Sequence, residues 1–261
     1  MNYIIGLDLD GTLLNDKKEI SEYNKNIINQ LINNNHKVFL VTGRSFDGAI
    51  NYYNELNLNT PLITLNGSLI TYKDKEVKTY FKKDFIKHYR MVDDLVLTAV
   101  FNSHNLIYTK NHDQELERIF NGNLGENYKE FNINKDYDDI LNAVVAIKDS
   151  DRVQFEKLFE HELYKARYWG SYDGIAFYDI HMTTVSKASA ILNMLEELNL
   201  SKEKLITIGD GVNDLEMLKM TKHGTAMKNA DLEIKTFASN TTFDDNNNDG
   251  VGKYLFTTLL K

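Results

Sequence analysis

Short apolar runs alternate with amphipathic helical patterns at both ends of the 261-residue chain. Near the N-terminus, the runs at residues 4–9, 37–41 and 62–65 have the length and apolar character of buried strands. The segments between them carry apolar residues at helical spacing, and Ser21 suits the N-cap position of the first helix. Strands separated by helices form parallel βαβ units with right-handed crossovers. The pattern therefore predicts an α/β domain with a Rossmann-like parallel sheet.

The pattern changes in the middle of the chain. Between residues 84 and 183, strand-like runs come in pairs across short turns, with helical segments between them, one of which is predicted at residues 114–120. Paired strands joined by short turns indicate an antiparallel or mixed sheet. From residue 186 the strand–helix alternation returns. We therefore predict a catalytic core made of residues 1–83 and 184–261, interrupted by an inserted α+β domain at residues 84–183.

Composition excludes several classes of protein. The chain has no cysteine, which rules out disulfides, thiol catalysis and cysteine-bound zinc. Its net charge of −8 and the lack of any segment dense in lysine and arginine disfavour nucleic-acid binding. No run approaches the roughly 18 apolar residues of a membrane-spanning helix, and the N-terminus lacks a signal-peptide pattern. We expect a cytoplasmic protein, monomer or homodimer, that binds small molecules rather than nucleic acid or membranes.

Two aspartates end the first apolar run. Asp8 and Asp10 flank Leu9, so strand alternation places both carboxylates on the same face. In open parallel sheets, ligands bind beyond the carboxyl ends of the strands, which is where Asp8 lies. Gly11 permits a sharp exit and lets backbone amides approach an anion. Because neighbouring carboxylates repel each other, the pair favours a divalent cation, most simply Mg²⁺, over an ordinary surface turn.

Three further polar stretches lie at strand–helix junctions of the same predicted domain. Residues 41–44 supply a hydroxyl, a bare amide and a guanidinium in the order Thr-Gly-Arg after a valine. Lys187 opens a helix and is a point cation suited to phosphate. The stretch TIGDGVND places Asp210, Asn213 and Asp214 around two glycines. Each stretch alone fits an ordinary loop, but their shared position at the edge of one sheet indicates a site.

Taken together, these residues resemble the motifs of the haloacid dehalogenase-like hydrolases, and among them the Cof-type phosphatases with a type IIB cap. DLDGTLL is similar to the first motif of the family, TGR to the second, Lys187 to the third and GDGVNDLEML to the fourth. LNGS at residues 65–68, AMKNA at 226–230 and NDGVGKYL at 248–255 match further signatures. The resemblance implies a core with an inserted cap that governs substrate choice. Lys228 departs from the family's usual glycine and adds a positive charge near the site.

The resemblance also implies a mechanism. Asp8 would be the nucleophile that forms an aspartyl-phosphate, and Asp10 would act first as general acid and then as base. Mg²⁺ would be held by Asp8, the backbone carbonyl of Asp10, and Asp210, with Asp214 near the ion or in its second coordination shell. The residues implied to bind the phosphoryl oxygens are Thr42, Gly43, Lys187 and Asn213. Further candidates for contact with the substrate are Arg44, Asn66, Gly67 and Trp169.

The function implied is a Mg²⁺-dependent phosphatase of small phosphorylated metabolites, such as sugar, nucleotide or cofactor phosphates. A phosphomutase could use the same aspartyl-phosphate and return the phosphoryl group to the substrate. A non-catalytic regulator that binds a phosphorylated metabolite is a third alternative, which the complete catalytic set disfavours. The segment at residues 245–250 is similar to the start of a calcium-binding EF-hand loop, but Phe256 stands where a bidentate Glu is required. We expect that segment to be a loop near the site.

Overall fold

The structure is a computed structural model that describes residues 2–103, 106–111 and 128–261. The helix predicted at residues 114–120 lies outside this part of the chain. Within the described residues, none of the helices combines the length and the apolar character needed to cross a membrane.

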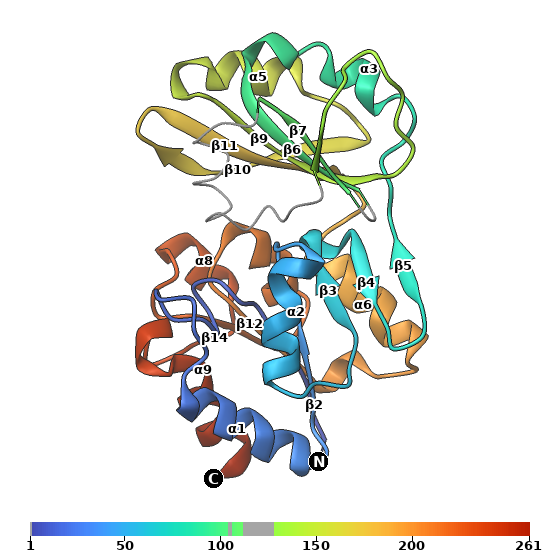
Figure 1. The fold of residues 1–261 in the computed structure, drawn as a ribbon. Coiled ribbons are helices and arrows are strands. Elements are labelled where there is room, and N and C mark those ends of the chain that lie inside the picture. Colours follow the sequence, from blue (N-terminus) through green and yellow to red (C-terminus); the bar gives the residue numbers. More distant parts are fainter. Residues whose placement is uncertain (1, 104–105, 112–127) are drawn as a thin grey trace. The chain divides into compact units, whose positions relative to one another are not determined.

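The described chain forms two compact units (Figure 1). The core unit combines Met1–Val77 with Ser186–Lys261, and the cap unit is Lys78–Val185. The two ends of the sequence, which share the strand–helix alternation, are therefore gathered in one unit. The first connection falls between Val77 and Lys78, within β5 (Glu76–Lys78), and the second between Val185 and Ser186. Each lies a few residues from the predicted boundary.

A five-stranded parallel sheet forms the centre of the core unit. Its strands, in spatial order, are β14 (Asn240–Thr241), β13 (His223–Ala226), β12 (Leu205–Gly209), β1 (Ile4–Leu7) and β2 (Lys37–Leu40). Every neighbouring pair runs parallel. The predicted Rossmann-like sheet is therefore confirmed, with β1 and β12 side by side at its centre.

Helices cover both faces of this sheet. One face packs against α1 (Glu22–Asn33), α2 (Phe46–Glu55) and α9 (Gly250–Leu255), which a π-helical turn at Phe256–Leu260 extends. The opposite face packs against α6 (Lys187–Glu197) and α7 (Leu215–Lys219), while α8 (Leu232–Phe237) lies beside α7. In α1, Ile28 and Leu31 are fully buried, as the helical stripe predicts.

Serine caps fix where two of the core helices begin. Ser21 accepts a hydrogen bond from the amide of Asn24 at 3.1 Å, which confirms the predicted N-cap of α1. At the start of α6, Ser186 and Ser189 form a reciprocal capping box. The box makes Lys187 the first residue of the helix, so the cap sets the position of the lysine.

The third predicted strand belongs to a second, smaller sheet. β3 (Leu62–Thr64) pairs antiparallel with β4 (Leu69–Thr71), and β5 completes the sheet. A single parallel bridge between Val41 and Ile63 joins β3 to the edge of the large sheet. The strand exists as predicted, but it does not extend the parallel sheet, because the chain reverses into β4 after three residues.

The cap unit is built on a mixed six-stranded sheet in the order β10-β11-β9-β6-β7-β8. The strands are β6 (Val96–Ser103), β7 (Ile107–Lys110), β8 (Tyr128–Glu130), β9 (Ile140–Lys148), β10 (Tyr164–Tyr172) and β11 (Ile175–Met182). Neighbours run antiparallel except for β7 and β8. Two helices, α3 (Phe85–Tyr89) and α5 (Arg152–Leu158), pack on the sheet through an aromatic core. This arrangement confirms the predicted α+β insert.

Candidate active site

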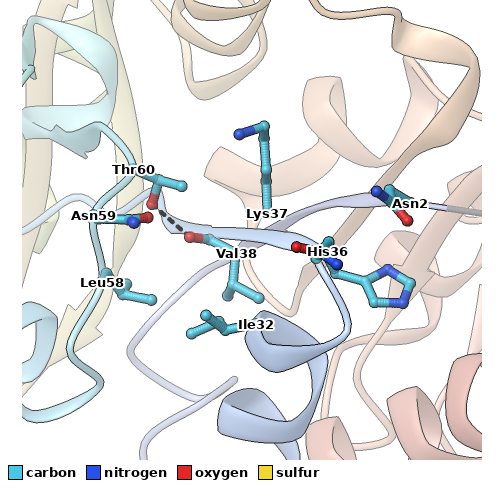
Figure 2. Close-up of a pocket in the computed structure, with 9 residues that line it drawn as sticks. Asn2, Ile32, His36, Lys37, Val38, Leu58, Asn59 and Thr60 are labelled. Carbon is cyan, nitrogen blue, oxygen red and sulfur yellow. Dashed lines mark hydrogen bonds between the residues drawn. The ribbon is translucent and has the colours of Figure 1, made fainter.

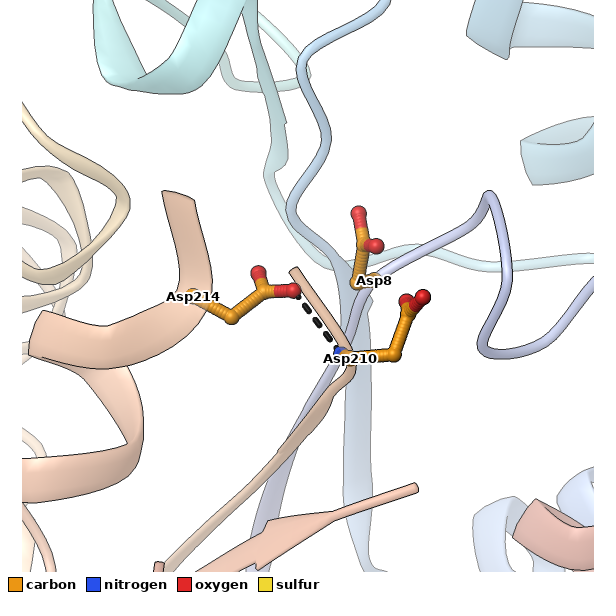
Figure 3. Close-up of side chains that lie close together, drawn as sticks. All are labelled: Asp8, Asp210 and Asp214. Carbon is orange, nitrogen blue, oxygen red and sulfur yellow. Dashed lines mark hydrogen bonds between the residues drawn. The ribbon is translucent and has the colours of Figure 1, made fainter. Parts of the chain in front are cut away.

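The carboxyl ends of β1 and β12 bring three aspartates together (Figure 3). Asp8 directly follows β1, Asp210 directly follows β12, and Asp214 ends the short 3₁₀ turn behind it. One carboxylate oxygen from each of the three lies within 4.8 Å of the others. Asp8 and Asp214 are buried, whereas Asp210 is partly exposed. The structure thus brings together three of the four residues predicted to hold a metal.

A fully buried lysine bridges two of these carboxylates. The Nζ atom of Lys187 donates to Oδ1 of Asp8 and to Oδ1 of Asp214, each at 2.6 Å. Burial by itself would lower the pKa of Lys187, but the two carboxylates outweigh it and raise the pKa to about 12. The lysine is therefore charged. Removing an ammonium group from water is costly, so a buried lysine stays charged only when carboxylates such as these pair with it.

Asp214 organises the loop as well as the lysine. Its Oδ2 accepts hydrogen bonds from the backbone amides of Asp210 at 3.0 Å and Gly211 at 2.9 Å, so both of its oxygens are engaged. A Cβ on Gly209 would lie 2.4 Å from the Asp214 side chain, so glycine is needed for this approach. Asp214 therefore fixes the loop that carries Asp210.

Asp8 and Asp210 both hold their protons more tightly than ordinary aspartates do. Burial raises the pKa of Asp8 well above its ordinary value; Asp214 adds to this effect and Lys187 opposes it. Burial also raises the pKa of Asp210 to about 6, although Thr12 donates to its Oδ1 at 2.7 Å. Among the described residues, Oδ2 of Asp8 and Oδ2 of Asp210 accept no hydrogen bond. These two oxygens are available to a further cation.

Asp10 has a different set of partners. Arg44 holds its carboxylate in a bidentate pair, with Nε 2.6 Å from Oδ2 and Nη2 2.7 Å from Oδ1, and Lys18 donates to Oδ1 at 2.8 Å. Burial alone would raise the pKa of Asp10, but the hydrogen bonds from Arg44 and Lys18 lower it to about 2. Asp10 is therefore ionised, and its carboxylate is not one of the three that converge. Arg44, a predicted substrate contact, forms this pair with Asp10.

Two of the predicted phosphate-binding residues, Gly43 and Asn213, approach the same side chain, that of Asn66. Thr42 is buried, and its hydroxyl accepts a hydrogen bond from the amide of Arg44 at 3.1 Å. Asn213 donates from Nδ2 to Oδ1 of Asn66 at 3.0 Å. A Cβ on Gly43 would lie 3.2 Å from the same oxygen, so this loop also approaches Asn66. Asn66, predicted as a substrate contact, is 1% exposed and lies between these groups.

The asparagine-rich segment before α9 clamps the loop that follows β1. Asn246 is buried and donates from Nδ2 to the carbonyl of Leu14 at 3.0 Å, and Asn247 donates to Oδ2 of Asp16 at 3.0 Å. Asn229 reaches the same loop and donates to the carbonyl of Gly11 at 2.7 Å. The segment predicted as a loop near the site therefore supports the chain around Asp8. The run of asparagines was the only sequence signal for this role.

Two further observations concern residues away from the convergent carboxylates. Trp169, the predicted substrate contact in the insert, lies on β10 of the cap unit and is half exposed. A pocket of about 380 Å³ lies beside Lys37 and Thr60, where β2 begins and just before β3 (Figure 2). It is at the opposite strand ends from Asp8, and no sequence motif predicted it.

A buried carboxylate, a bridging lysine and a glycine-rich loop thus meet where parallel strands end. Ligands of open α/β sheets bind at this edge. Charged groups held in fixed positions suit phosphoryl transfer, which depends mainly on positioning and charge neutralisation. The fold and the site therefore define the class of α/β phosphoryl-transfer enzymes.

Comparison with known proteins narrows this class. A family model of haloacid dehalogenase-like hydrolases matches residues 5–255. The chain is 29% identical to the 5-amino-6-(5-phospho-D-ribitylamino)uracil phosphatase YitU of Bacillus subtilis, over 97% of this chain and 96% of that protein. It is 26% identical to the pyridoxal phosphate phosphatase YbhA of Escherichia coli, with 98% of both chains covered. A solved sugar phosphatase of subclass IIB shares the fold with a TM-score of 0.83, at 19% identity over 98% of both chains.

The chain belongs to the haloacid dehalogenase-like hydrolase family. Its family and fold agree with the Cof-type, subclass IIB resemblance that the sequence motifs indicate. By class, it is a phosphomonoesterase.

Proposed function

We propose that the protein is a Mg²⁺-dependent phosphatase of small phosphorylated metabolites that works through an aspartyl-phosphate on Asp8. The observation that carries this proposal is the bridge from Lys187 to Asp8 and Asp214 inside a buried carboxylate cluster. The bridge fixes the orientation of the Asp8 carboxylate, as attack on phosphorus requires. Lys187 also supplies a positive charge for the incoming phosphoryl group.

Asp10 is proposed to handle the proton of the leaving group. Its carboxylate is ionised in the fork of Arg44, which is the state required of the base that activates water. Protonating a leaving group first requires that at least one oxygen leave the fork and gain a proton. Arg44 therefore controls when Asp10 acts as an acid, and Lys18 reinforces that control.

The phosphoryl oxygens are proposed to lie against the hydroxyl of Thr42, the amide of Gly43, Lys187 and the side-chain amide of Asn213. These groups are donors at fixed positions, as stabilisation of a phosphoryl-transfer transition state requires. Support for this cradle comes from the shared contact of Gly43 and Asn213 with Asn66.

A divalent cation fits the donor set at the strand ends. Three carboxylates converge with only one ammonium group between them, and two oxygens accept no hydrogen bond among the described residues. Oxygen ligands of this kind suit Mg²⁺. Asp8, Asp210 and the backbone carbonyl of Asp10 would hold the ion, with Asp214 in support. When bound, Mg²⁺ would neutralise negative charge and act as a Lewis acid toward the phosphoryl oxygens.

The cap unit is proposed to select the leaving group. Two relatives are named for phosphates of a ribitylaminouracil and of pyridoxal, both of which carry a nitrogen-containing ring. An aromatic side chain such as Trp169 can pack against a ring of this kind. Trp169→Ala should then change kcat/KM unequally across substrates and spare a small one such as acetyl phosphate. A uniform loss, or none, would remove Trp169 from the specificity surface.

A phosphate-release screen tests the proposed function. The purified protein with Mg²⁺ is assayed against a panel of phosphorylated metabolites that includes pyridoxal phosphate, sugar phosphates, nucleotides and flavin mononucleotide. We expect free phosphate from a subset of the panel, and none from the same substrates with the Asp8→Asn variant. An isomerised product without free phosphate would indicate a phosphomutase. Binding without turnover of any compound would contradict the proposal.

A further inference from the structure

The turn after β3 has an uncommon backbone conformation. Three consecutive residues, Leu65, Asn66 and Gly67, have φ values of 50°, 55° and 105°. A left-handed φ is uncommon for residues other than glycine and is most costly for bulky ones such as Leu65. On either side, Thr64 and Ser68 bury hydroxyls that have no hydrogen-bond partner among the described residues. The turn therefore carries a local cost that other contacts must offset.

One side of this turn holds the loop after β2. The amide of Leu65 donates to the carbonyl of Arg44 at 2.9 Å, and the amide of Asn66 donates to the carbonyl of Thr42 at 3.0 Å. Gly43 lies between these two carbonyls, and a Cβ there would lie 3.2 Å from Oδ1 of Asn66, closer than an ordinary contact. The turn thus fixes both ends of the loop that is proposed to receive phosphoryl oxygens.

The same turn reaches two other parts of the proposed cradle. The side chain of Asn213 donates to Oδ1 of Asn66 at 3.0 Å. A Cβ on Gly67 would lie 2.5 Å from the carbonyl oxygen of Ser186, the cap of the helix that begins with Lys187. Three segments that are distant in sequence therefore converge on one three-residue turn. Asn66 is 1% exposed, so protein groups rather than solvent surround its side chain.

We propose that Asn66 is a positioning residue. Its buried amide sets the distance between Asn213 and the Thr42–Gly43 loop, and so shapes the phosphate cradle without contacting the substrate. Asparagine suits this position because its side chain accepts a hydrogen bond and its backbone tolerates the left-handed region. The inference rests on the proposed function and replaces the sequence prediction that Asn66 contacts the substrate.

A double-mutant cycle tests this role. Asn66→Gly removes the amide and keeps the left-handed backbone accessible, and Asn213→Ala removes its partner. We expect Asn66→Gly to lower kcat/KM by about tenfold or more, and to raise the inhibition constant of inorganic phosphate by a similar factor. In the Asn213→Ala background, Asn66→Gly should change kcat/KM by less than about twofold, because the side chain that Asn66 positions is already absent.

Two further variants control the cycle. Asn57, an exposed left-handed asparagine just after α2, is a matched control, and Asn57→Gly should change neither constant. Asn66→Asp keeps an acceptor and the backbone tolerance, and its added charge is present in both backgrounds. In the Asn66→Asp protein, Asn213→Ala should therefore lower kcat/KM by the same factor as it does in the parent. In the Asn66→Gly protein, Asn213→Ala should lower kcat/KM hardly at all.

The outcomes separate this inference from the proposed function. The positioning role would be overturned if Asn66→Gly lowered kcat/KM equally with and without Asn213. It would also be overturned if Asn66→Gly left the inhibition constant of inorganic phosphate at the parental value. Neither result would contradict the proposed phosphatase activity. The positioning role would also be overturned if Asn213→Ala no longer lowered kcat/KM in the Asn66→Asp protein. An unmodified protein that releases phosphate from no substrate would instead refute the proposed function, and the inference with it.

Discussion

At the scale of single residues, the ionisation of each carboxylate in the site depends on its burial and on the cationic side chains that pair with it. Lys187 is shared between Asp8 and Asp214, while Asp10 draws on Arg44 and Lys18. Burial, reinforced by Asp214, keeps the pKa of Asp8 well above its ordinary value despite Lys187. At Asp10, the hydrogen bonds from Arg44 and Lys18 outweigh burial and lower the pKa to about 2. Two aspartates separated by one residue are thereby prepared for different tasks.

Asp10→Asn should separate proton transfer from attack on phosphorus. The variant keeps the size of the side chain but cannot exchange a proton, so turnover of an alkyl phosphate should fall by about 10²–10⁴-fold. An activated aryl phosphate, whose leaving group needs no proton, should lose much less in the phosphorylation step. Single-turnover rates with the two substrates measure the difference. Equal losses for both would argue against an acid role for Asp10.

The sequence predicted part of this site and not the rest. Asp8 and Asp210 follow apolar strands directly, so their position at the sheet edge can be read from local pattern. The fork between Arg44 and Asp10 joins residues 34 positions apart, and the Asn66–Asn213 bond joins residues 147 apart. Nothing in the local pattern distinguishes such a partner from a substrate-binding side chain.

At the scale of elements, strand and helix positions followed from hydrophobic periodicity, whereas pairing did not. The strand at β3 was predicted from its apolar run, but its antiparallel partner β4 was not. That pairing depends on the left-handed turn at Leu65–Gly67, and left-handed backbone at a leucine has no sequence signature. The conformation of this turn is set by its tertiary contacts with the loop after β2.

The clamp on the loop after β1 predicts a measurable stability difference. Asn246→Ala would leave the buried carbonyl of Leu14 without its donor, at a cost of about 1–3 kcal/mol in the free energy of unfolding. Asn248, exposed and bonded only within its own turn to Asp245, is the matched control, and Asn248→Ala should cost less than about 0.5 kcal/mol. Urea unfolding of the three proteins tests this. Equal costs would show that the clamp adds nothing.

His88 on α3 should make the stability of the cap unit depend on pH. Its ring is buried, meets Phe159 edge-on and lies tilted against His161, with Nε2 3.2 Å from the carbonyl of Phe159. Burial lowers the pKa of His88 below its ordinary 6.5, so the unfolded chain binds a proton more readily than the folded one. Its contribution is therefore complete above about pH 6.5 and is lost as pH falls through the lowered pKa.

Unfolding measured across that pH range checks the assignment. Between about pH 7.5 and pH 5.5, the parent should lose more stability than His88→Asn, which carries no titrating group at this position. Identical pH dependence in the two proteins would show that another group is responsible.

At the scale of the whole molecule, the core unit joins the first and last parts of the chain around the proposed phosphate site, in a protein of net charge −8. Such a protein gives a phosphate ester no general attraction, so binding depends on local cations. The strand alternation at both ends of the sequence predicted this assembly. The roles of the two units remain predictions.

Chelation tests the metal requirement. EDTA should abolish phosphate release, and Mg²⁺ should restore it. Mg²⁺ should also stabilise the folded parent by about 2.7 kcal/mol at a hundred times its dissociation constant. Asp210→Asn, which removes one carboxylate charge from the proposed site, should lose most of this gain. Full activity in metal-free buffer, or equal stabilisation of the variant, would refute the site.

Trapping of the phosphoenzyme tests the central claim most directly. The protein is mixed with a substrate carrying a labelled phosphoryl group, quenched in acid within the first turnover, digested, and the labelled peptide is sequenced by mass spectrometry. The account predicts one added phosphoryl group on Asp8, in the peptide that contains residues 3–16, and none in Asp8→Asn, whose kcat should fall by about 10⁴-fold or more. Label on any other residue, or turnover by Asp8→Asn at the parental rate, would contradict it.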